Sequence, residues 1–181
     1  MVYVFLADGF EEIEALFCVD LLRRAGLELR TVAVGGNCKV RGSHGIEVIA
    51  DIKDTEFCDM TPSVVVLPGG MPGTTNLENS STVQIAINNC INLGNLVCAI
   101  CAAPSILGKR GYLNKKRVTC FPGFEQYLEG AIFTNERVVR DGNIITAKGM
   151  GCAAEFALAI IEAILGKERA DEIAKSAIIV E

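Results

Sequence analysis

The chain has 181 residues, 50% of them hydrophobic, which fits a single α/β domain over residues 1–181 with a self-sufficient core. Its formal net charge of −5 and the lack of a long basic run argue against nucleic acid as a partner. No segment approaches the roughly 18–20 continuous apolar residues of a membrane span and no basic leader opens the chain, so we expect a cytoplasmic protein without membrane contact.

The N-terminal third has the pattern of a strand–helix–strand unit. Met1–Ala7 is a continuous apolar run, typical of a strand that is buried on both faces. Apolar residues at helical spacing predict a helix over Glu11–Ala25, and Gly26 is expected to end it. A second strand is expected at Leu29–Val34, and a short strand at Ile46–Ile49 is expected at an edge of the sheet.

The middle of the chain supplies a buried strand, a glycine loop and a helix. Val64–Leu67 predicts a strand that runs into Gly69 and Gly70, where the lack of side chains allows another group to approach the backbone closely. The N–H groups of this loop are candidates for anion binding. A helix is expected over Ser81–Leu93, and the next apolar strand ends at Cys101.

The last third continues the alternation of strands and helices. Arg117–Thr119 predicts a short strand, and Val138–Thr146 predicts a hairpin with Asp-Gly at its turn. An apolar helix is expected over Cys152–Leu165, packed on the sheet or on a partner, followed by a more polar helix over Lys167–Ser176. This order predicts an α/β, doubly wound, mostly parallel sheet between helices, with its sites beyond the carboxyl ends of the strands.

The eight cysteines do not indicate a disulfide framework. Such frameworks belong to short secreted chains with weak cores, whereas this chain is long and apolar, so we expect mostly free thiols. A metal site is not expected either, because His44 is the only imidazole and most cysteines stand alone in the sequence. The pattern therefore predicts a protein without a metal or other cofactor.

Cys101 lies where an apolar strand meets a helix start, as the nucleophile does in a nucleophile elbow. So sharp a turn needs small residues two positions before and two positions after the nucleophile, and Ala99 and Ala103 meet this demand. Pro104 suits the first turn of a helix. Because unpaired N–H groups and the helix dipole favour a thiolate at a helix N-terminus, we expect Cys101 to ionise readily.

Two other interpretations of Cys101 remain open. A free cysteine packs as a small hydrophobe, so a buried core position is the alternative to a nucleophile. Cys98 and Cys101 also have the spacing of a dithiol redox motif. That role is disfavoured, because Cys98 lies inside the apolar strand and is expected to face away from Cys101.

Four motifs in register carry a resemblance to a known family. Asp8–Glu14, Val65–Gly70, Ala99–Pro104 and Gly149–Gly151 together resemble the ThiJ/PfpI family, which includes a parkinsonism-associated protein deglycase. The match covers nearly the full chain. The resemblance implies a flavodoxin-like α/β sandwich that forms a homodimer and acts on a small carbonyl substrate.

The same resemblance implies roles for individual residues. The family's nucleophilic, oxidisable cysteine falls on Cys101, and its partner acid falls on Glu14. Backbone donors to an oxyanion fall on Gly70, with Gly69 beside it, and on Ala102. The alternative for Glu14 is a solvent-facing acid in the first turn of a helix, where the helix dipole favours negative charge.

The chain departs from the family's pattern at one position. Many relatives have histidine before a proline near the nucleophile, where this chain has Phe121, so it resembles the bacterial ThiJ-type subgroup that lacks this histidine. The departure disfavours a peptidase, and an amidotransferase-type hydrolase is disfavoured because no histidine follows His44. His44, Cys120, Phe121 and Gly149 are further candidates for the pocket, and His44 is equally consistent with a structural or exposed role.

These features favour one function and leave a second open. The first is a cofactor-independent cysteine enzyme of the glyoxalase III or deglycase type, in which Cys101 attacks a reactive dicarbonyl and Glu14 moves protons. The second is a redox-sensing or chaperone-like stress protein, in which Cys101 is oxidised without turnover.

Overall fold

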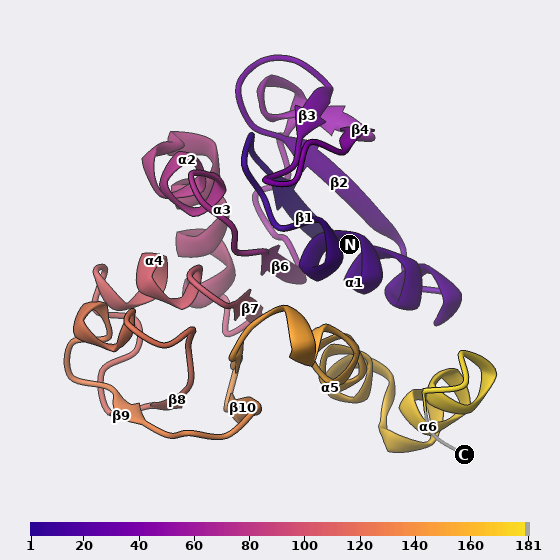
Figure 1. The fold of residues 1–181 in the computed structure, drawn as a ribbon, viewed down its shortest axis with the longest axis vertical. Helices are drawn as coiled ribbons and strands as arrows, with labels where there is room; N and C mark the ends of the chain where they lie inside the picture. Colours follow the sequence, from indigo (N-terminus) through magenta and orange to yellow (C-terminus); the bar gives the residue numbers. More distant parts are fainter. Residues whose placement is uncertain (180–181) are drawn as a thin grey trace.

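A seven-stranded sheet runs through the middle of the computed structural model, which describes residues 1–179 (Figure 1). Its strand order is β10-β11-β7-β6-β1-β2-β5, and every neighbouring pair is parallel except β10 and β11. The strands are β1 (Val2–Leu6), β2 (Leu29–Ala33), β5 (Ile52–Lys53), β6 (Val64–Leu67), β7 (Leu96–Ile100), β10 (Val138–Asp141) and β11 (Ile144–Ala147).

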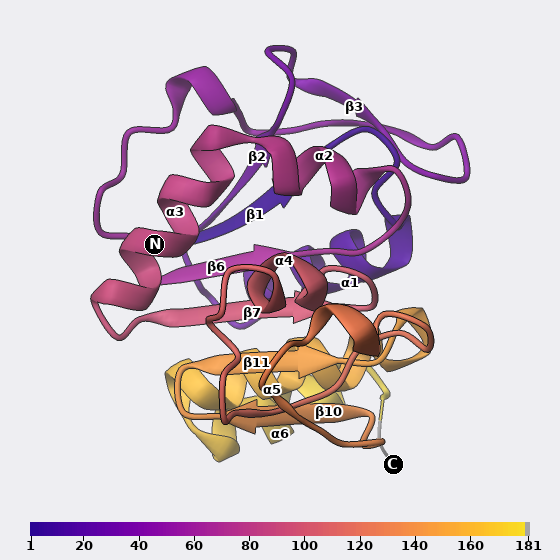
Figure 2. The same ribbon diagram turned by 90° about the vertical axis from the view of Figure 1, so that its left-hand side faces the viewer.

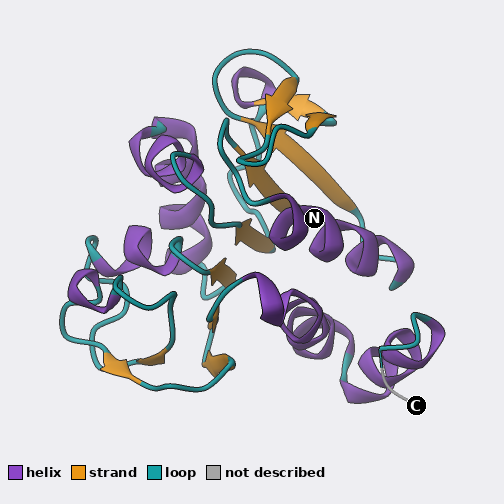
Figure 3. Ribbon diagram, in the orientation of Figure 1, coloured by secondary structure: helices purple, strands orange, loops and turns teal. Residues whose placement is uncertain are grey.

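Helices cover both faces of this sheet (Figures 1 and 3). One face carries α1 (Glu12–Arg24), α5 (Ala153–Leu165) and α6 (Lys167–Ser176), and the other carries α2 (Gly73–Asn79), α3 (Ser81–Asn92) and α4 (Pro104–Gly108). In the view of Figure 2, α3 and α4 lie in front of β6 and β7. The predicted α/β sandwich with a mostly parallel sheet is therefore confirmed.

Each central strand contributes to two separate hydrophobic cores. Along β1, Val4 packs with the residues of α1 and α5, whereas the next residue, Phe5, packs with those of α2, α3 and α4. The side chains of successive strand residues point to opposite faces, so a strand that is covered on both sides must be apolar at every position. This explains the unbroken apolar runs of β1 and β6, all of whose residues are buried.

Glycine ends the first helix as the sequence predicts. Gly26 follows α1 with φ of +84°, a left-handed conformation that costs other residues free energy. Its N–H donates to the Arg23 carbonyl, and the Leu27 N–H donates to the Leu22 carbonyl. These two bonds form a Schellman motif, which satisfies the last carbonyl groups of the helix.

Some predicted elements differ from the structure. The edge position expected for Ile46–Ile49 is wrong, because β4 (Glu47–Ile49) pairs only with β3 (Lys39–Arg41) in a separate two-stranded sheet, and β5 takes the edge. Likewise, β8 (Arg117–Val118) pairs with β9 (Ile132–Phe133) outside the main sheet. The hairpin of β10 and β11 and the helices α5 and α6 lie where they were expected.

The topology brings several loops together at one end of the sheet. Among the five strands of the central parallel core, the spatial order is β2-β1-β6-β7-β11, which is the doubly wound order with a switch point between β1 and β6. Ligands bind at such points, outside the carboxyl ends of the strands. The segments that follow β1, β6 and β7 carry Glu14, Gly69 and Cys101 respectively.

No helix among residues 1–179 combines the length and the apolar character needed to cross a lipid bilayer.

Candidate active site

Cys101 occupies a strained turn directly after β7. Its φ is +63°, a left-handed conformation that is rare for residues with a side chain. The turn is fixed on both sides, because the Cys101 N–H donates to the Ala147 carbonyl at 2.9 Å and the Ala103 N–H donates to the Ile100 carbonyl at 3.0 Å. Pro104 then opens α4, as expected for a proline at the first helical position. This is the strand–turn–helix geometry of a nucleophile elbow.

The neighbours of Cys101 leave no room for larger side chains. Ala99 and Ala103 are fully buried. A Cβ atom added to Gly69 would lie 2.7 Å from the Cys101 Cβ and 2.7 Å from Glu14 Oε2, much closer than van der Waals contact. Gly69 is therefore required here for space, and its φ is not in the left-handed region.

Glu14 reaches the same point from the first turn of α1. Its side chain is buried, which excludes the solvent-facing alternative considered from the sequence. Oε2 accepts a hydrogen bond of 2.8 Å from the Gly69 N–H, whereas Oε1 is buried without a hydrogen-bond partner among the described residues. A buried acceptor without a partner is costly, but a protonated oxygen is a donor. The arrangement therefore favours a proton on Oε1.

Burial changes the acidity of both members of this pair. Burial raises the pKa of Glu14 to about 7, the charge of Glu11 adds to the rise, and the Gly69 N–H and the Cys101 thiol oppose it. Burial, and then the charge and contact of Glu14, raise the pKa of the Cys101 thiol well above its usual range. The carboxyl thus keeps its proton to near neutral pH.

The helix start was expected to favour the Cys101 thiolate, but burial outweighs this effect and raises the pKa of the thiol. Helix α4 has only five residues, so its dipole is small, and burial dominates the pKa of the thiol. The groups that favour the thiolate are the backbone N–H groups of Ala102 and Gly70, whose hydrogen bonding to the sulfur lowers the pKa of Cys101. The charge of Glu14 acts against the thiolate, so ionisation of Cys101 is favoured when the pair's remaining proton lies on Glu14.

The loop of Gly70 is tied to the start of α1. Gly70 has a φ of +88°, and a Cβ added there would lie 2.4 Å from the Glu11 nitrogen. The Glu11 N–H in turn donates to the Gly69 carbonyl at 2.9 Å. From this position the Gly70 N–H lowers the pKa of the Cys101 thiol. Five of the predicted site residues therefore lie together: Glu14, Gly69, Gly70, Cys101 and Ala102.

The structure places four other cysteine and pocket candidates: Cys98, Cys120, Phe121 and Gly149. Cys98 is a fully buried core residue and is a free thiol, as are the other seven cysteines. Cys120 is also fully buried, and its neighbour Phe121 donates a backbone hydrogen bond of 2.8 Å to the Cys101 carbonyl. The exposed ring of Phe121 and the backbone of Gly149 line a hollow of about 330 Å³, together with Pro122, Lys148, Met150, Gly151 and Cys152.

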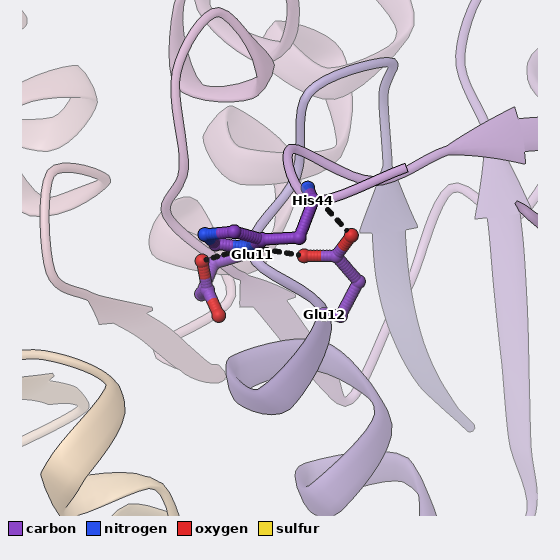
Figure 4. A group of neighbouring side chains, drawn as sticks. All are labelled: Glu11, Glu12 and His44. Atoms are coloured by element: carbon purple, nitrogen blue, oxygen red, sulfur yellow. Dashed lines mark hydrogen bonds and ion pairs between the residues drawn. The ribbon is translucent and has the colours of Figure 1, made fainter. Parts of the chain in front are cut away.

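His44 belongs to a second cluster at the N-terminus of α1 (Figure 4). Its exposed imidazole Nδ1 lies 2.9 Å from Glu12 Oε2 and 3.3 Å from Glu11 Oε2. The hydrogen bond with Glu12 and the charges of both carboxylates raise the pKa of His44. The His44 ring therefore contacts the carboxylates of Glu11 and Glu12 rather than the thiol of Cys101.

The sequence did not predict that Glu12 is a buried carboxylate that binds the loop of residues 44–46. Burial opposes its ionisation, but hydrogen bonds from His44 and from backbone N–H groups lower its pKa to about 2. The side chain is buried, and a Cβ on Gly42 would lie 2.3 Å from its carboxyl carbon. The only sequence signal was three acids in one helical turn, and their partners in the loop lie about thirty residues away in the sequence.

Comparison with known proteins supports the fold and the site together. A family model described as "DJ-1/PfpI family" matches residues 1–163. The chain is 36% identical to Protein dj-1beta of Drosophila melanogaster over 178 residues, which covers 97% of this chain and 95% of that protein. It is 31% identical over 167 residues to a Caenorhabditis elegans protein named glutathione-independent glyoxalase DJR-1.2, covering 91% of this chain and 88% of that protein.

A solved structure matches equally well. Oxidized DJ-1 of Toxoplasma gondii superposes with a TM-score of 0.94 at 34% identity, covering 98% of this chain and 97% of the other. Likeness of this extent confirms the family resemblance and the fold that it implied.

Proposed function

Because the chain belongs to the DJ-1/PfpI family, we propose that it is a cofactor-independent cysteine enzyme that acts on small reactive dicarbonyls such as methylglyoxal, or on their adducts with thiols and amines. The observation that carries this proposal is the pair of partly buried Cys101 and buried Glu14, beside two backbone N–H groups that lower the pKa of the thiol. A relative named glutathione-independent glyoxalase supports the class of reaction.

In the first step the Cys101 thiolate adds to the aldehyde carbon. A carbon–sulfur bond forms, and the electron pair of the carbonyl moves onto its oxygen. The N–H groups of Gly70 and Ala102 lower the pKa of the thiol, so they favour negative charge here and are the donors we assign to the new oxyanion. Glu14 Oε1 then gives its proton to the oxyanion, which completes a hemithioacetal.

In the second step Glu14 moves a proton along the substrate. Its carboxylate takes the proton from the former aldehyde carbon and delivers it to the ketone oxygen, which gives an enediol. Glu14 then takes the proton of the first hydroxyl, whose oxygen becomes the thioester carbonyl, and returns a proton to the former ketone carbon. The first carbon is oxidised and the second is reduced, so the step needs no outside oxidant and no cofactor. The product is a thioester of Cys101, which water cleaves to a hydroxy acid and the free thiol.

Lactate formation from methylglyoxal tests this function. We expect Cys101→Ala to abolish it and Glu14→Gln to lower the rate by about 10²–10⁴-fold, the usual worth of a positioned acid–base group. Cys58→Ala is the matched control, because Cys58 is an exposed thiol outside the site, and it should keep the wild-type rate. Equal rates in wild type, Cys101→Ala and Glu14→Gln would refute the proposal.

We also propose that proton transfer proceeds without histidine, as in the ThiJ-type subgroup that lacks one beside the nucleophile. Phe121 holds that position, and the chain's single histidine, His44, contacts Glu11 and Glu12. Peptidase and amidotransferase chemistry need a histidine base next to the cysteine and are disfavoured for this reason.

A redox-sensing or chaperone-like stress role is the second candidate, favoured by the close likeness to a relative solved in an oxidised form. Oxidation of Cys101 to sulfenic or sulfinic acid would place oxygens next to Glu14 and the N–H groups of Gly70 and Ala102. Mass spectrometry after mild peroxide treatment should find Cys101 oxidised before Cys58. Oxidation of Cys58 with Cys101 intact would rule this role out.

The resemblance also leads us to propose a homodimer. Ile13 and Phe17 are exposed one turn apart on α1, as expected for apolar side chains that a partner covers. Light scattering should give a mass of twice the chain's 19.4 kDa, and a mass of one chain would refute this.

A further inference from the structure

Four side-chain atoms converge where the loop of residues 42–46 meets the start of α1. Figure 4 draws the side chains of Glu11, Glu12 and His44. The four atoms are Oε2 of Glu11, Oε2 of Glu12, Nδ1 of His44 and Oγ of Ser43. Nδ1 lies 2.9 Å from the Glu12 oxygen and 3.3 Å from the Glu11 oxygen. Ser43 Oγ lies 3.3 Å from each carboxylate oxygen and 3.1 Å from Nδ1. The atoms of Glu11, Glu12 and His44 all lie within 4.8 Å of one another.

These separations are those of a tetrahedral metal site. In a tetrahedron with metal–ligand bonds of about 2.0 Å, as Zn²⁺ forms with nitrogen and oxygen, the ligand atoms lie about 3.3 Å apart. Five of the six separations among the four atoms are between 2.9 and 3.3 Å. The set is close enough to hold an ion after shifts of a few tenths of an ångström in most of these distances.

Glu12 and the backbone at Ser43 are held by hydrogen bonds outside the cluster. The other oxygen of Glu12, Oε1, accepts a hydrogen bond of 2.8 Å from the backbone N–H of His44. Oε2 therefore remains directed at the cluster. The Ser43 N–H donates to the Phe10 carbonyl at 2.8 Å, which holds the loop against the residue before the helix. Such support of a ligand by a second hydrogen bond is how proteins orient metal ligands.

We propose that Glu11, Glu12 and His44 bind a Zn²⁺ ion, with the Ser43 hydroxyl or a water molecule as the fourth ligand. One imidazole and two carboxylates match the nitrogen and oxygen ligands of zinc sites that keep one open position. Mg²⁺ and Ca²⁺ prefer six or more oxygen ligands, which this set does not supply. The two carboxylates offset the charge of the ion, and the bound ion fastens the loop to α1.

The proposal is independent of chemistry at Cys101. Its three ligands come from Glu11 and Glu12 at the start of α1 and from His44 in the loop, and none is a thiol. From the sequence no metal site was expected, because His44 is the only imidazole and most cysteines stand alone. His44 lies 32 positions from Glu12, and only the fold brings the two side chains together.

Calorimetric titration of the full chain with Zn²⁺ alone, after treatment with a chelator, tests the site. Wild type should bind one ion per chain. His44→Ala and Glu11→Gln should each weaken binding roughly tenfold or more, since loss of even a supporting partner of a ligand costs about 10–100-fold. Glu47→Gln, which removes an exposed carboxylate of β4, and Cys101→Ala should bind as wild type does.

Thermal unfolding provides a second measurement on the same samples. Zn²⁺ should raise the Tm of wild type and of Cys101→Ala but not that of His44→Ala, because an ion that binds only the folded chain stabilises it. His44 is exposed, so its removal leaves the core intact. Failure of wild type to bind, binding unchanged in both His44→Ala and Glu11→Gln, or binding lost in Cys101→Ala would each overturn the proposal.

Discussion

At the scale of single residues, Cys101 and Glu14 act as one titrating pair. Glu14 is buried and Cys101 is partly buried. The Cys101 thiol lowers the pKa of Glu14, and Glu14 raises the pKa of Cys101. The first proton therefore leaves the pair near pH 7, and the second leaves only at strongly alkaline pH. Between these points one proton is shared by the carboxyl and the thiol. A thiolate beside a protonated carboxyl is the form that can attack a carbonyl group and then protonate the product.

The candidate nucleophile was predictable from local sequence, but its acidity was not. Ala99, Ala103 and Pro104 mark the elbow because the steric demands of the turn act on adjacent residues. The pKa of Cys101 depends on burial and on a carboxyl that lies 87 positions away in the sequence. Pro104 marks where α4 begins, but the sequence does not show that this helix has only five residues.

At the scale of elements, the site depends on how closely three segments approach one another. The loop after β6 packs between the elbow after β7 and the first turn of α1, and only a residue without a side chain fits at Gly69. Its N–H fixes Glu14, and its lack of Cβ admits Cys101. Gly69 is thus a positioning residue for the pair.

Gly69→Ala should lower lactate formation by roughly 10²-fold, because a displacement of about 1 Å at a reacting group has that effect. The added Cβ would lie 2.7 Å from both Cys101 Cβ and Glu14 Oε2, so one of them must move. Gly151→Ala is the matched control, since its Cβ would meet no atom within 4 Å. Wild-type activity in Gly69→Ala would contradict this role, and far-ultraviolet circular dichroism would confirm that both variants fold.

Elements with strong periodic patterns were predictable, and short elements were not. The helices α1, α3, α5 and α6 and the strands β1, β2, β6 and β7 lie within a few residues of their predicted bounds. Helix α2 was missed because its sequence, Gly73–Asn79, is polar and begins with glycine, a poor helix former. The separate sheets of β3–β4 and β8–β9 were missed because strands of two or three residues carry almost no pattern.

At the scale of the whole molecule, the buried carboxyl of Glu14 costs stability at neutral pH. The pKa of Glu14 is about 7 in the folded chain, against an ordinary value of 4.5. Between these values the unfolded chain has lost the proton and the folded chain keeps it, so stability falls as pH rises from about 4.5 to about 7 and stays lower above. The full cost above pH 7 is about 3 kcal/mol.

Glu14→Gln should therefore stabilise the fold at alkaline pH while it impairs activity. We expect the free energy of unfolding in urea at pH 8 to rise by about 1–3 kcal/mol, since the buried amide keeps an unpaired donor that offsets part of the gain. This gain should be absent near pH 4, where the carboxyl is protonated in both states. A variant that is less stable than wild type at pH 8 would contradict the cost assigned to Glu14.

The most direct test of the shared proton is the rate at which iodoacetamide alkylates Cys101 as a function of pH, followed by mass spectrometry of its peptide. In wild type we expect the rate to rise through about pH 7, where the pair loses its first proton. In Glu14→Gln the rise should move to the alkaline side of the ordinary thiol pKa of 9.0, because burial then acts on the thiol alone. The same midpoint in both proteins would contradict a proton shared between Cys101 and Glu14.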